Sequence, residues 1–264
     1  MKIYRERNRE LWNNWTKIHL NSPFYNLEAF KQGKSSLKSI ENEFFREISG
    51  KSLLHLQCHF GQDTLSLARL GADVVGVDLS DSAIESARNL ATELDLSAEF
   101  ICSDLYELED KLDRTFDYVF TSYGVLAWLN DITEWGALVS RYLKKGGQFF
   151  IVEFHPMANM LADDGITLEY PYFSHEQPMV FKSSGSYADT DSDLENEEFI
   201  WTHNLGDVIT SLCKSGLHIT EVKEYPFSTW NSYSFLEEVE ADVFKAKGTA
   251  VDYPLMYSIS ALKP

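Results

Sequence analysis

The residues best suited to chemistry lie in the first third of the chain. A short apolar run at residues 53–56 leads into a loop that ends at Gly61, and the positions after Gly61 are spaced as an amphipathic helix. A second apolar run, residues 74–77, ends on Asp78. Amide groups at the start of such a helix face a ligand, and a carboxylate at the tip of the next strand accepts hydrogen bonds from ribose hydroxyls. Residues 51–78 therefore predict a nucleoside-binding strand–helix–strand unit.

The loop at residues 57–61 has one glycine where a dinucleotide-binding fingerprint has three. Gln57 and His59 stand where the other two glycines would fall. Without those glycines the backbone cannot approach a pyrophosphate closely, which disfavours NAD and FAD. A ligand with a ribose but no phosphate is more compatible with the loop, and S-adenosylmethionine is such a ligand.

Two motifs resemble those of a known family. LLHLQCHFG at residues 53–61 and GVDLS at residues 76–80 resemble the first two motifs of class I S-adenosylmethionine-dependent methyltransferases, whose first motif usually reads like LDLGCGTG. Here His55 replaces the acidic residue, Gln57 and His59 replace two glycines, and Phe60 replaces threonine. The variant is similar to that of a subgroup acting on small molecules. The resemblance implies S-adenosylmethionine as the cofactor and methyl transfer to a small-molecule acceptor.

The resemblance also implies which residues bind the cofactor. Asp104, which follows a predicted strand at residues 98–102, matches the family's third motif, where a carboxylate accepts the adenine amino group. Residues 116–121 match the fourth motif, whose tip should lie under the methyl group. The expected cofactor-binding residues are Gln57, Cys58, His59, Gly61, Asp78, Leu79, Ser103, Asp104, Leu105 and Ser122.

Two residues are candidates for catalysis. His155, at the end of a predicted strand over residues 147–153, is positioned to act as a general base. Tyr123, at the tip of the fourth strand, is a candidate methyl-facing aromatic or hydrogen-bond partner. The alternative is that both side chains only shape the pocket.

The elements that position these residues alternate along the chain. Apolar patterns predict strands at residues 53–56, 74–77, 98–102, 116–121, 147–153, 217–222 and 256–262, mostly with helices between them. This order resembles the methyltransferase sheet, in which the seventh strand lies antiparallel. The expected fold class is therefore α/β, a Rossmann-like seven-stranded sheet with helices on both faces.

The remaining segments are interpreted as covers for that sheet. Residues 1–48 predict a helical cap, and residues 49–264 a methyltransferase domain with insertions at about 156–202 and 226–252. The first insertion has scattered aromatic residues and predicts a lid. Its segments PMVFKSSGSY and EEFIWTHN are expected to pair as a hairpin, and the acidic stretch 189–198 predicts a solvated turn.

Composition limits the possible partners and location. Lys and Arg total 23 against 41 acidic residues, a formal net charge of −18, which disfavours nucleic acid as a substrate. Three cysteines without a CxxC pair indicate the reduced cytoplasm and predict no metal site. No apolar run approaches membrane-spanning length, and the charged first residues do not resemble a signal peptide, so a soluble cytoplasmic protein is expected.

Two other function classes stay open on these residues. One is a protein of the same fold that binds S-adenosylmethionine or another nucleoside without turnover, which the altered glycine loop favours. The other is an NAD(P)-dependent oxidoreductase, which the single glycine disfavours. The identity of the acceptor, the atom methylated and the oligomeric state do not follow from the sequence.

Overall fold

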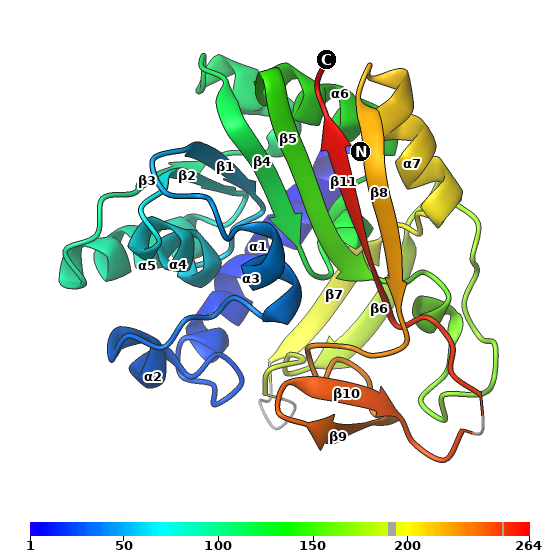
Figure 1. The fold of residues 1–264 in the computed structure, drawn as a ribbon. Helices are drawn as coiled ribbons and strands as arrows, with labels where there is room; N and C mark the ends of the chain where they lie inside the picture. Colours follow the sequence, from blue (N-terminus) through cyan, green and yellow to red (C-terminus); the bar gives the residue numbers. More distant parts are fainter. Residues whose placement is uncertain (190–193, 250) are drawn as a thin grey trace.

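A seven-stranded sheet forms the centre of the computed structural model, which describes residues 1–189, 194–249 and 251–264 (Figure 1). The strands lie in the spatial order β3-β2-β1-β4-β5-β11-β8. The last strand, β11, is antiparallel to both of its neighbours, and the other pairings are parallel. The predicted fold class and the antiparallel final strand are confirmed. The strands span Ser52–Leu56 (β1), Asp73–Asp78 (β2), Glu99–Cys102 (β3), Phe116–Ser122 (β4), Leu143–Phe154 (β5), His218–Tyr225 (β8) and Met256–Leu262 (β11).

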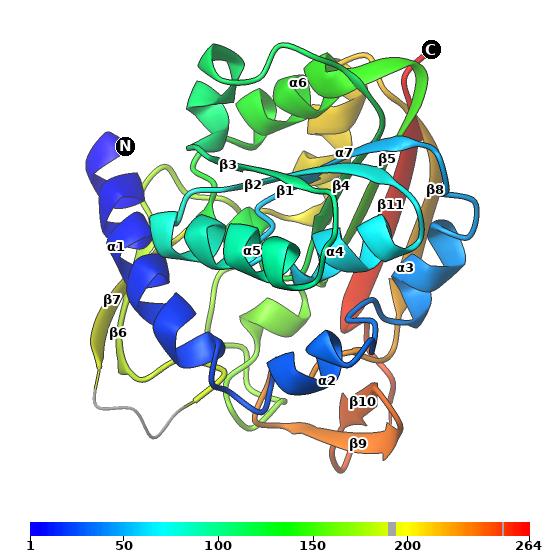
Figure 2. The ribbon, with the colours of Figure 1, turned by 90° about the vertical axis from the view of Figure 1, so that its left-hand side faces the viewer.

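Helices cover both faces of this sheet, as Figure 2 shows from the side. Side chains of a strand point alternately to the two faces, so neighbouring residues of one strand join different clusters. Leu54 and Leu56 of β1 belong to the cluster under α6 and α7, whereas Leu53 belongs to the cluster under α3 and α4. The helices are α3 (Ser39–Phe44), α4 (Gln62–Arg69), α5 (Asp81–Glu93), α6 (Ile132–Tyr142) and α7 (Leu205–Lys214).

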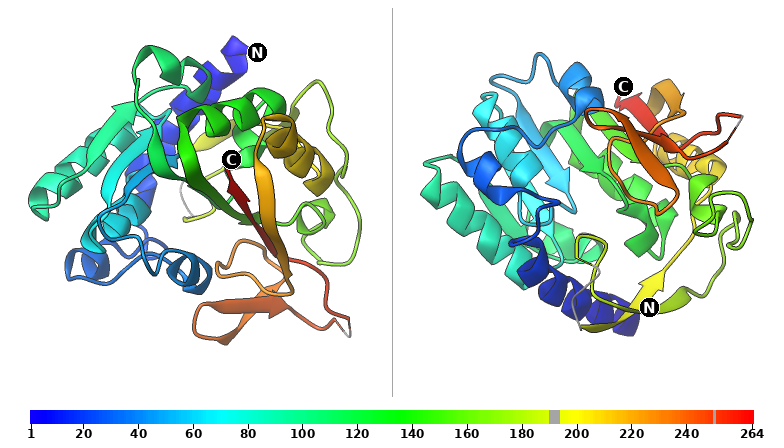
Figure 3. Two further views of the ribbon diagram at one scale, coloured as in Figure 1. Left: turned by 45° about the horizontal axis from the view of Figure 1, so that its top comes forward. Right: turned by 90° about the horizontal axis from the view of Figure 1, so that it is seen from below.

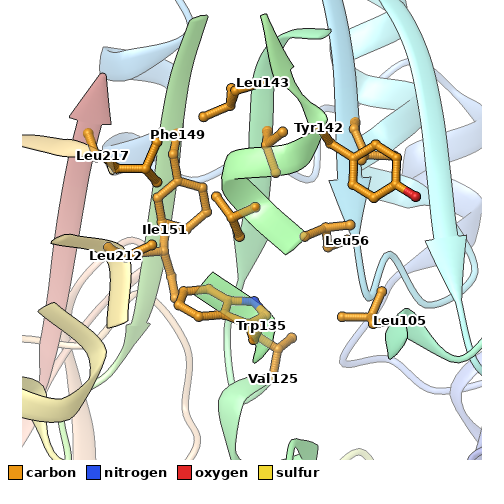
Figure 4. Packing of buried hydrophobic residues seen from close by; sticks show 14 of the residues in the cluster. Leu56, Leu105, Val125, Trp135, Tyr142, Leu143, Phe149, Ile151, Leu212 and Leu217 are labelled. Carbon is orange, nitrogen blue, oxygen red and sulfur yellow. The ribbon is translucent and has the colours of Figure 1, made fainter. Parts of the chain in front are cut away.

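The core beneath α6 and α7 is centred on large aromatic side chains (Figure 4). Trp135 of α6 is fully buried, and its ring centroid lies 5.6 Å from that of Phe149 on β5. Ile151 of β5 and Leu212 of α7 belong to the same cluster. Burial of such side chains stabilises the sheet by roughly 1.5–3 kcal/mol each. The rigid sheet then fixes where the strand ends lie.

The segments outside the sheet gather at the carboxyl ends of its parallel strands, as the view from below in Figure 3 shows. β6 and β7 pair antiparallel, which confirms the predicted hairpin. These segments are α1 (Lys2–His19), α2 (Leu27–Lys31), the β6–β7 hairpin (Met179–Ser184 and Glu195–Ile200) and the β9–β10 hairpin (Leu236–Glu240 and Val243–Ala246).

The acidic stretch 189–198 differs from the predicted turn where it is described. Glu195–Glu198 form the first part of β7, and the Asn196 side chain is buried and donates to the carbonyl of Gly185. Pairing with β6 therefore extends further than the acidic composition suggested. Residues 190–193 of the predicted turn lie outside the described residues. In the described part of the chain, no helix has the length and apolar character needed to cross a membrane.

Candidate functional site

A cavity of about 360 Å³ lies at the carboxyl ends of the parallel strands. All of the predicted cofactor-binding residues line it, and so does Tyr123. Open α/β sheets bind their ligands at this edge, because helix starts and strand tips converge there. The fold therefore brings the residues that were predicted to bind the cofactor to one place.

The loop between β1 and α4 keeps a glycine-like backbone without the glycines. Gln57 and His59 have φ angles of 56° and 51°, and Gly61 has a φ of 82°. A residue with a Cβ atom in this left-handed region costs roughly 1–2 kcal/mol. Hydrogen bonds hold the loop in place, since the Cys58 amide donates to the Val77 carbonyl at 2.9 Å and Gln57 Nε2 donates to the Val125 carbonyl at 2.9 Å.

Gly61 is the position of the loop that requires glycine for space as well as for φ. A Cβ atom there would lie 2.8 Å from ring atoms of Phe100. Gly61 precedes α4 as its N-cap residue, and the Leu65 amide donates to its carbonyl at 2.8 Å. The first amide groups of α4 therefore begin at the wall of the cavity, where they favour negative charge.

Asp78 ends β2 with its carboxylate in the cavity wall. Its Oδ1 accepts from the Ser80 amide at 2.9 Å, and its Oδ2 accepts from the His59 amide at 2.8 Å. Burial raises the pKa of Asp78 to about 6, and these amide donors oppose the rise. The group is ionised at neutral pH, and each oxygen keeps capacity to accept a further hydrogen bond.

Asp104 occupies the corresponding position after β3, next to a 3₁₀ helix, η1 (Leu105–Asp110). Its Oδ1 accepts from the Tyr106 amide at 3.0 Å, and its carboxylate forms an ion pair with Arg5 of α1. The Arg5 guanidinium also lies 5.2 Å from the centre of the Tyr106 ring. The N-terminal helix thus reaches the strand tip that the sequence predicts for adenine.

Several buried polar atoms of the cavity wall have no hydrogen-bond partner among the residues that the structure describes. Buried polar groups are normally paired, so unpaired ones concentrated in a cavity indicate a ligand. His55, at the position of the family's acidic residue, uses Nδ1 with Thr64 Oγ1 at 2.8 Å, and burial lowers its pKa to about 3. The unpaired atoms are His55 Nε2, Gln57 Oε1, His59 Nδ1 and Trp230 Nε1.

Asp63, in the first turn of α4, is a cavity residue that the sequence reasoning missed. Ser122 Oγ donates to its Oδ2 at 3.5 Å. Burial raises the pKa of Asp63, while Ser36 and the positive charge of Lys38 lower it. The sequence could have indicated Asp63, because it lies two residues after Gly61 and the first turn of α4 directly follows the loop at residues 57–61.

Tyr123 follows β4 in a left-handed conformation, with a φ of 49°. Thr229 Oγ1 donates to the Tyr123 hydroxyl at 3.2 Å. Glu41 of α3 is fully buried, and the side chains that act on its pKa are Asp63 and Tyr123. Burial, followed by the charge of Asp63, raises the pKa of Glu41 to about 7. A strained residue beside a buried carboxyl group is typical of functional sites.

Glu153 fixes the backbone that follows Tyr123. Its carboxylate accepts from the Val125 amide at 2.8 Å and the Leu126 amide at 3.1 Å, and also from the amides of Gly124 and Phe154. Hydrogen bonds to an ionised acceptor are stronger than neutral ones. The buried carboxylate therefore holds the end of β4 against the end of β5.

The structure places His155 away from the other predicted residues. Phe154 lines the cavity, and the next side chain along the chain, His155, does not. Its Nδ1 accepts from the Met157 amide at 3.0 Å, and its Nε2 lies 2.9 Å from Glu224 Oε1. His155 follows the end of β5, at the predicted sheet edge, but its side chain does not line the cavity because side chains alternate in direction at the strand end; its role as a general base stays a prediction.

Aromatic side chains from α1 close the cavity above the loop at residues 57–61. Trp12 contacts the rings of His59 and Trp128, with ring centroids 5.2 Å apart in both pairs. His19 Nδ1 lies 2.8 Å from His59 Nε2, which joins α1 to the loop. Burial lowers the pKa of both histidines, so this pair is neutral at physiological pH.

Comparison with known proteins agrees with this geometry. Residues 53–147 match the family model described as a methyltransferase domain. A solved S-adenosylmethionine-dependent methyltransferase from Clostridium acetobutylicum superposes with a TM-score of 0.57 over 93% of this chain and 94% of that chain, at 16% identity. Residues 53–147 carry a methyltransferase domain. The predicted resemblance to S-adenosylmethionine-dependent methyltransferases is confirmed, whereas the detail of the two motifs stays a prediction.

Two curated methyltransferases are each similar to part of this chain. A ubiquinone biosynthesis O-methyltransferase of Coxiella burnetii is 32% identical over 114 residues, which are 43% of this chain and 47% of the relative. Phosphoethanolamine N-methyltransferase 1 of Triticum aestivum is 31% identical over 112 residues, 40% of this chain and 22% of the relative. The chain thus spans less than half the length of either relative.

Proposed function

We propose that the chain transfers the methyl group of S-adenosylmethionine to a small-molecule acceptor. The observation that carries this proposal is that every cofactor residue inferred from the motifs lines one cavity together with Tyr123. The matched methyltransferase domain and the methyltransferase activities in the names of its relatives support the same reaction class.

The residues of the cavity fit the parts of this cofactor. Asp78 would accept hydrogen bonds from the ribose hydroxyls, since both of its oxygens retain acceptor capacity. Asp104, with Leu79, Ser103 and Leu105 beside it, would hold the adenine. Asp63 and the unpaired Gln57 Oε1 would accept from the ammonium group of the methionine part.

When bound, the cofactor would supply a methyl group on a sulfonium, which leaves as a neutral thioether. The protein therefore has to position the acceptor in line and exclude water, and such orientation contributes roughly 7–11 kcal/mol to rate acceleration. Tyr123 would face the methyl group as an aromatic contact or a hydrogen-bond partner. Residues 1–48 would act as a cap and residues 156–202 as a lid over the cavity.

A small organic molecule suits the cavity better than a macromolecule. The lining combines aromatic rings with a few polar groups, as in sites that enclose small ligands. The net charge of −18 would repel a phosphate backbone. The cytoplasmic location expected from the three free cysteines belongs to the same proposal.

Calorimetric titration tests the cofactor assignment. We expect S-adenosylmethionine and S-adenosylhomocysteine to bind with one site per chain, and NADH not to bind. Binding of NADH with no binding of either S-adenosyl compound would overturn the proposal and favour the oxidoreductase. Binding of S-adenosylmethionine without turnover on a broad panel of small amines, phenols and thiols would favour the non-catalytic protein of the same fold.

A further inference from the structure

We propose that the acceptor is a small organic cation that binds against an aromatic wall of the cavity; this inference rests on the proposed function. The wall lies where β4 and β5 end, beyond the residues assigned to the cofactor. Its residues come from four segments that are distant in sequence, and all of them line the cavity: Phe24, Tyr123, Phe154, Trp230 and Tyr233.

The rings of the wall form a continuous series. Trp230 stacks on Phe24, with centroids 4.9 Å apart and planes 22° apart, and meets Tyr123 edge-on at 6.0 Å. Tyr123 lies 6.0 Å from Phe154, which lies 5.8 Å from Tyr233. Aromatic faces are electronegative and attract organic cations within about 6 Å.

The charged groups of the cavity also favour a positively charged ligand. Arg5 is the cationic residue that lines the cavity in the described part of the chain, and Asp104 neutralises it. The other charged groups in the lining are the carboxyl groups of Asp63, Asp78 and Glu198. If Asp63 and Asp78 bind the cofactor, the carboxyl group of Glu198 remains in the lining. No unpaired cationic side chain remains there among the described residues. An acceptor with a phosphate or carboxylate would therefore lack a cationic side chain to pair with.

Carboxyl groups next to the wall make its surface more negative. The negative charges of Glu41 and Glu153 act on the hydroxyl groups of Tyr123 and Tyr233 respectively. The Glu41 carboxyl group is fully buried, and its interaction with the Tyr123 hydroxyl lowers its pKa only against the larger effect of burial, which raises it. Low local dielectric strengthens the effect of such charges on a ligand.

Trp230 already contacts an ammonium group in the structure. Lys38 Nζ lies 4.4 Å from the centre of the Trp230 ring and pairs with Asp242 at 2.7 Å. Lys38 itself does not line the cavity, within the residues described. The indole Nε1 is buried and has no partner among the residues that the structure describes, so it can also donate to a hydroxyl oxygen of a bound cation. Trp230 is therefore the residue whose replacement tests the wall.

Three probes of similar shape separate charge from apolar contact. Choline, its neutral isostere 3,3-dimethylbutanol and the anion 3,3-dimethylbutanoate are titrated calorimetrically into the protein, with and without saturating S-adenosylhomocysteine. We expect choline to bind about tenfold or more tightly than the neutral isostere, since a desolvated cation–π contact corresponds to roughly that factor. The anion should bind least.

Variants test whether the aromatic wall causes the preference for choline over its neutral isostere. Trp230→Leu should lower choline affinity about tenfold and leave the neutral isostere nearly unchanged, whereas Trp230→Phe should retain most of the preference. Val222→Ala, at a position on β8 that is 39% exposed and lies outside both the cavity and its proposed cover, is the control and should have no effect. Retained binding of S-adenosylhomocysteine and an unchanged circular dichroism spectrum show that each variant is folded.

The outcomes distinguish this inference from the proposed function. If S-adenosylhomocysteine binds but choline does not, or the isostere or the anion binds as tightly as choline, the cationic acceptor is wrong and the methyltransferase proposal stands. If S-adenosylhomocysteine does not bind, the proposed function fails. In that case, comparing the affinities of the protein without S-adenosylhomocysteine for choline and for the neutral isostere still shows whether the cavity selects cations.

Discussion

Replacing Gln57 or His59 by glycine and by alanine tests the left-handed loop at the heart of the site. Both residues have positive φ angles, 56° and 51°, where the family motif has glycine. Neither glycine nor alanine carries the native side chain, so the lost Gln57–Val125 hydrogen bond is common to both variants. The difference between them therefore reports the backbone conformation alone.

The expected difference follows from two opposing terms. Alanine in the left-handed region costs roughly 1–2 kcal/mol. Glycine avoids that cost, but its extra freedom in the unfolded chain costs roughly 0.5–1 kcal/mol. The glycine variant should therefore be more stable than the alanine variant by about 0.5–1 kcal/mol at each of the two positions.

Urea unfolding followed by circular dichroism measures these free energies. Glu85, exposed on α5, is the matched control, because at a helical position the order reverses and alanine is favoured by about 0.8–1.0 kcal/mol. If alanine proves as stable as glycine at residue 57 or 59 while the Glu85 pair behaves as expected, the left-handed loop is incorrect.

Three further predictions concern the cavity and its cover. Asp78→Ala should weaken S-adenosylmethionine binding by tenfold to a hundredfold in calorimetry, since bonds to a charged acceptor contribute roughly 1.5–3 kcal/mol, and an unchanged Kd would refute the ribose assignment. Glu41→Gln should stabilise the fold by roughly 3 kcal/mol at pH 8 but little at pH 4. The reason is that the Glu41 pKa, about 7 when folded against an ordinary 4.5, penalises folding increasingly as the pH rises from 4.5 to 7; equal effects on urea unfolding at both pH values would refute it. Amide exchange across residues 170–187 should slow when cofactor and acceptor bind, while β1 and β4 change little; no slowing would argue against a lid.

The positions of the strands along the chain, and the residues at their carboxyl ends, were predictable because they depend on local patterns. An apolar run specifies a buried strand, and the residue that ends the run lies at the sheet edge whatever surrounds it. Asp78 and Asp104 could therefore be placed before any contact was known. The antiparallel final strand came from the family resemblance instead.

The acceptor side was less predictable because it depends on contacts between distant segments. Glu41 lies in a short amphipathic helix, where a glutamate is ordinarily exposed, and only the packing of α3 on the sheet buries it. His155 follows a strand end whose side-chain direction was not fixed by the sequence pattern. Trp230 comes from an insertion with no counterpart in the motifs.

The two residues that replace glycine suggest why the altered loop is compatible with a working site. Glycine would supply the left-handed backbone without strain, but it has no side chain to reach other elements. Gln57 bonds the Val125 carbonyl beyond β4, and His59 joins His19 of α1. The loop is thereby tied both to the strand tip that carries Tyr123 and to the helix that closes the cavity. A conformational cost of roughly 1–2 kcal/mol per residue is offset by contacts that a glycine loop cannot make.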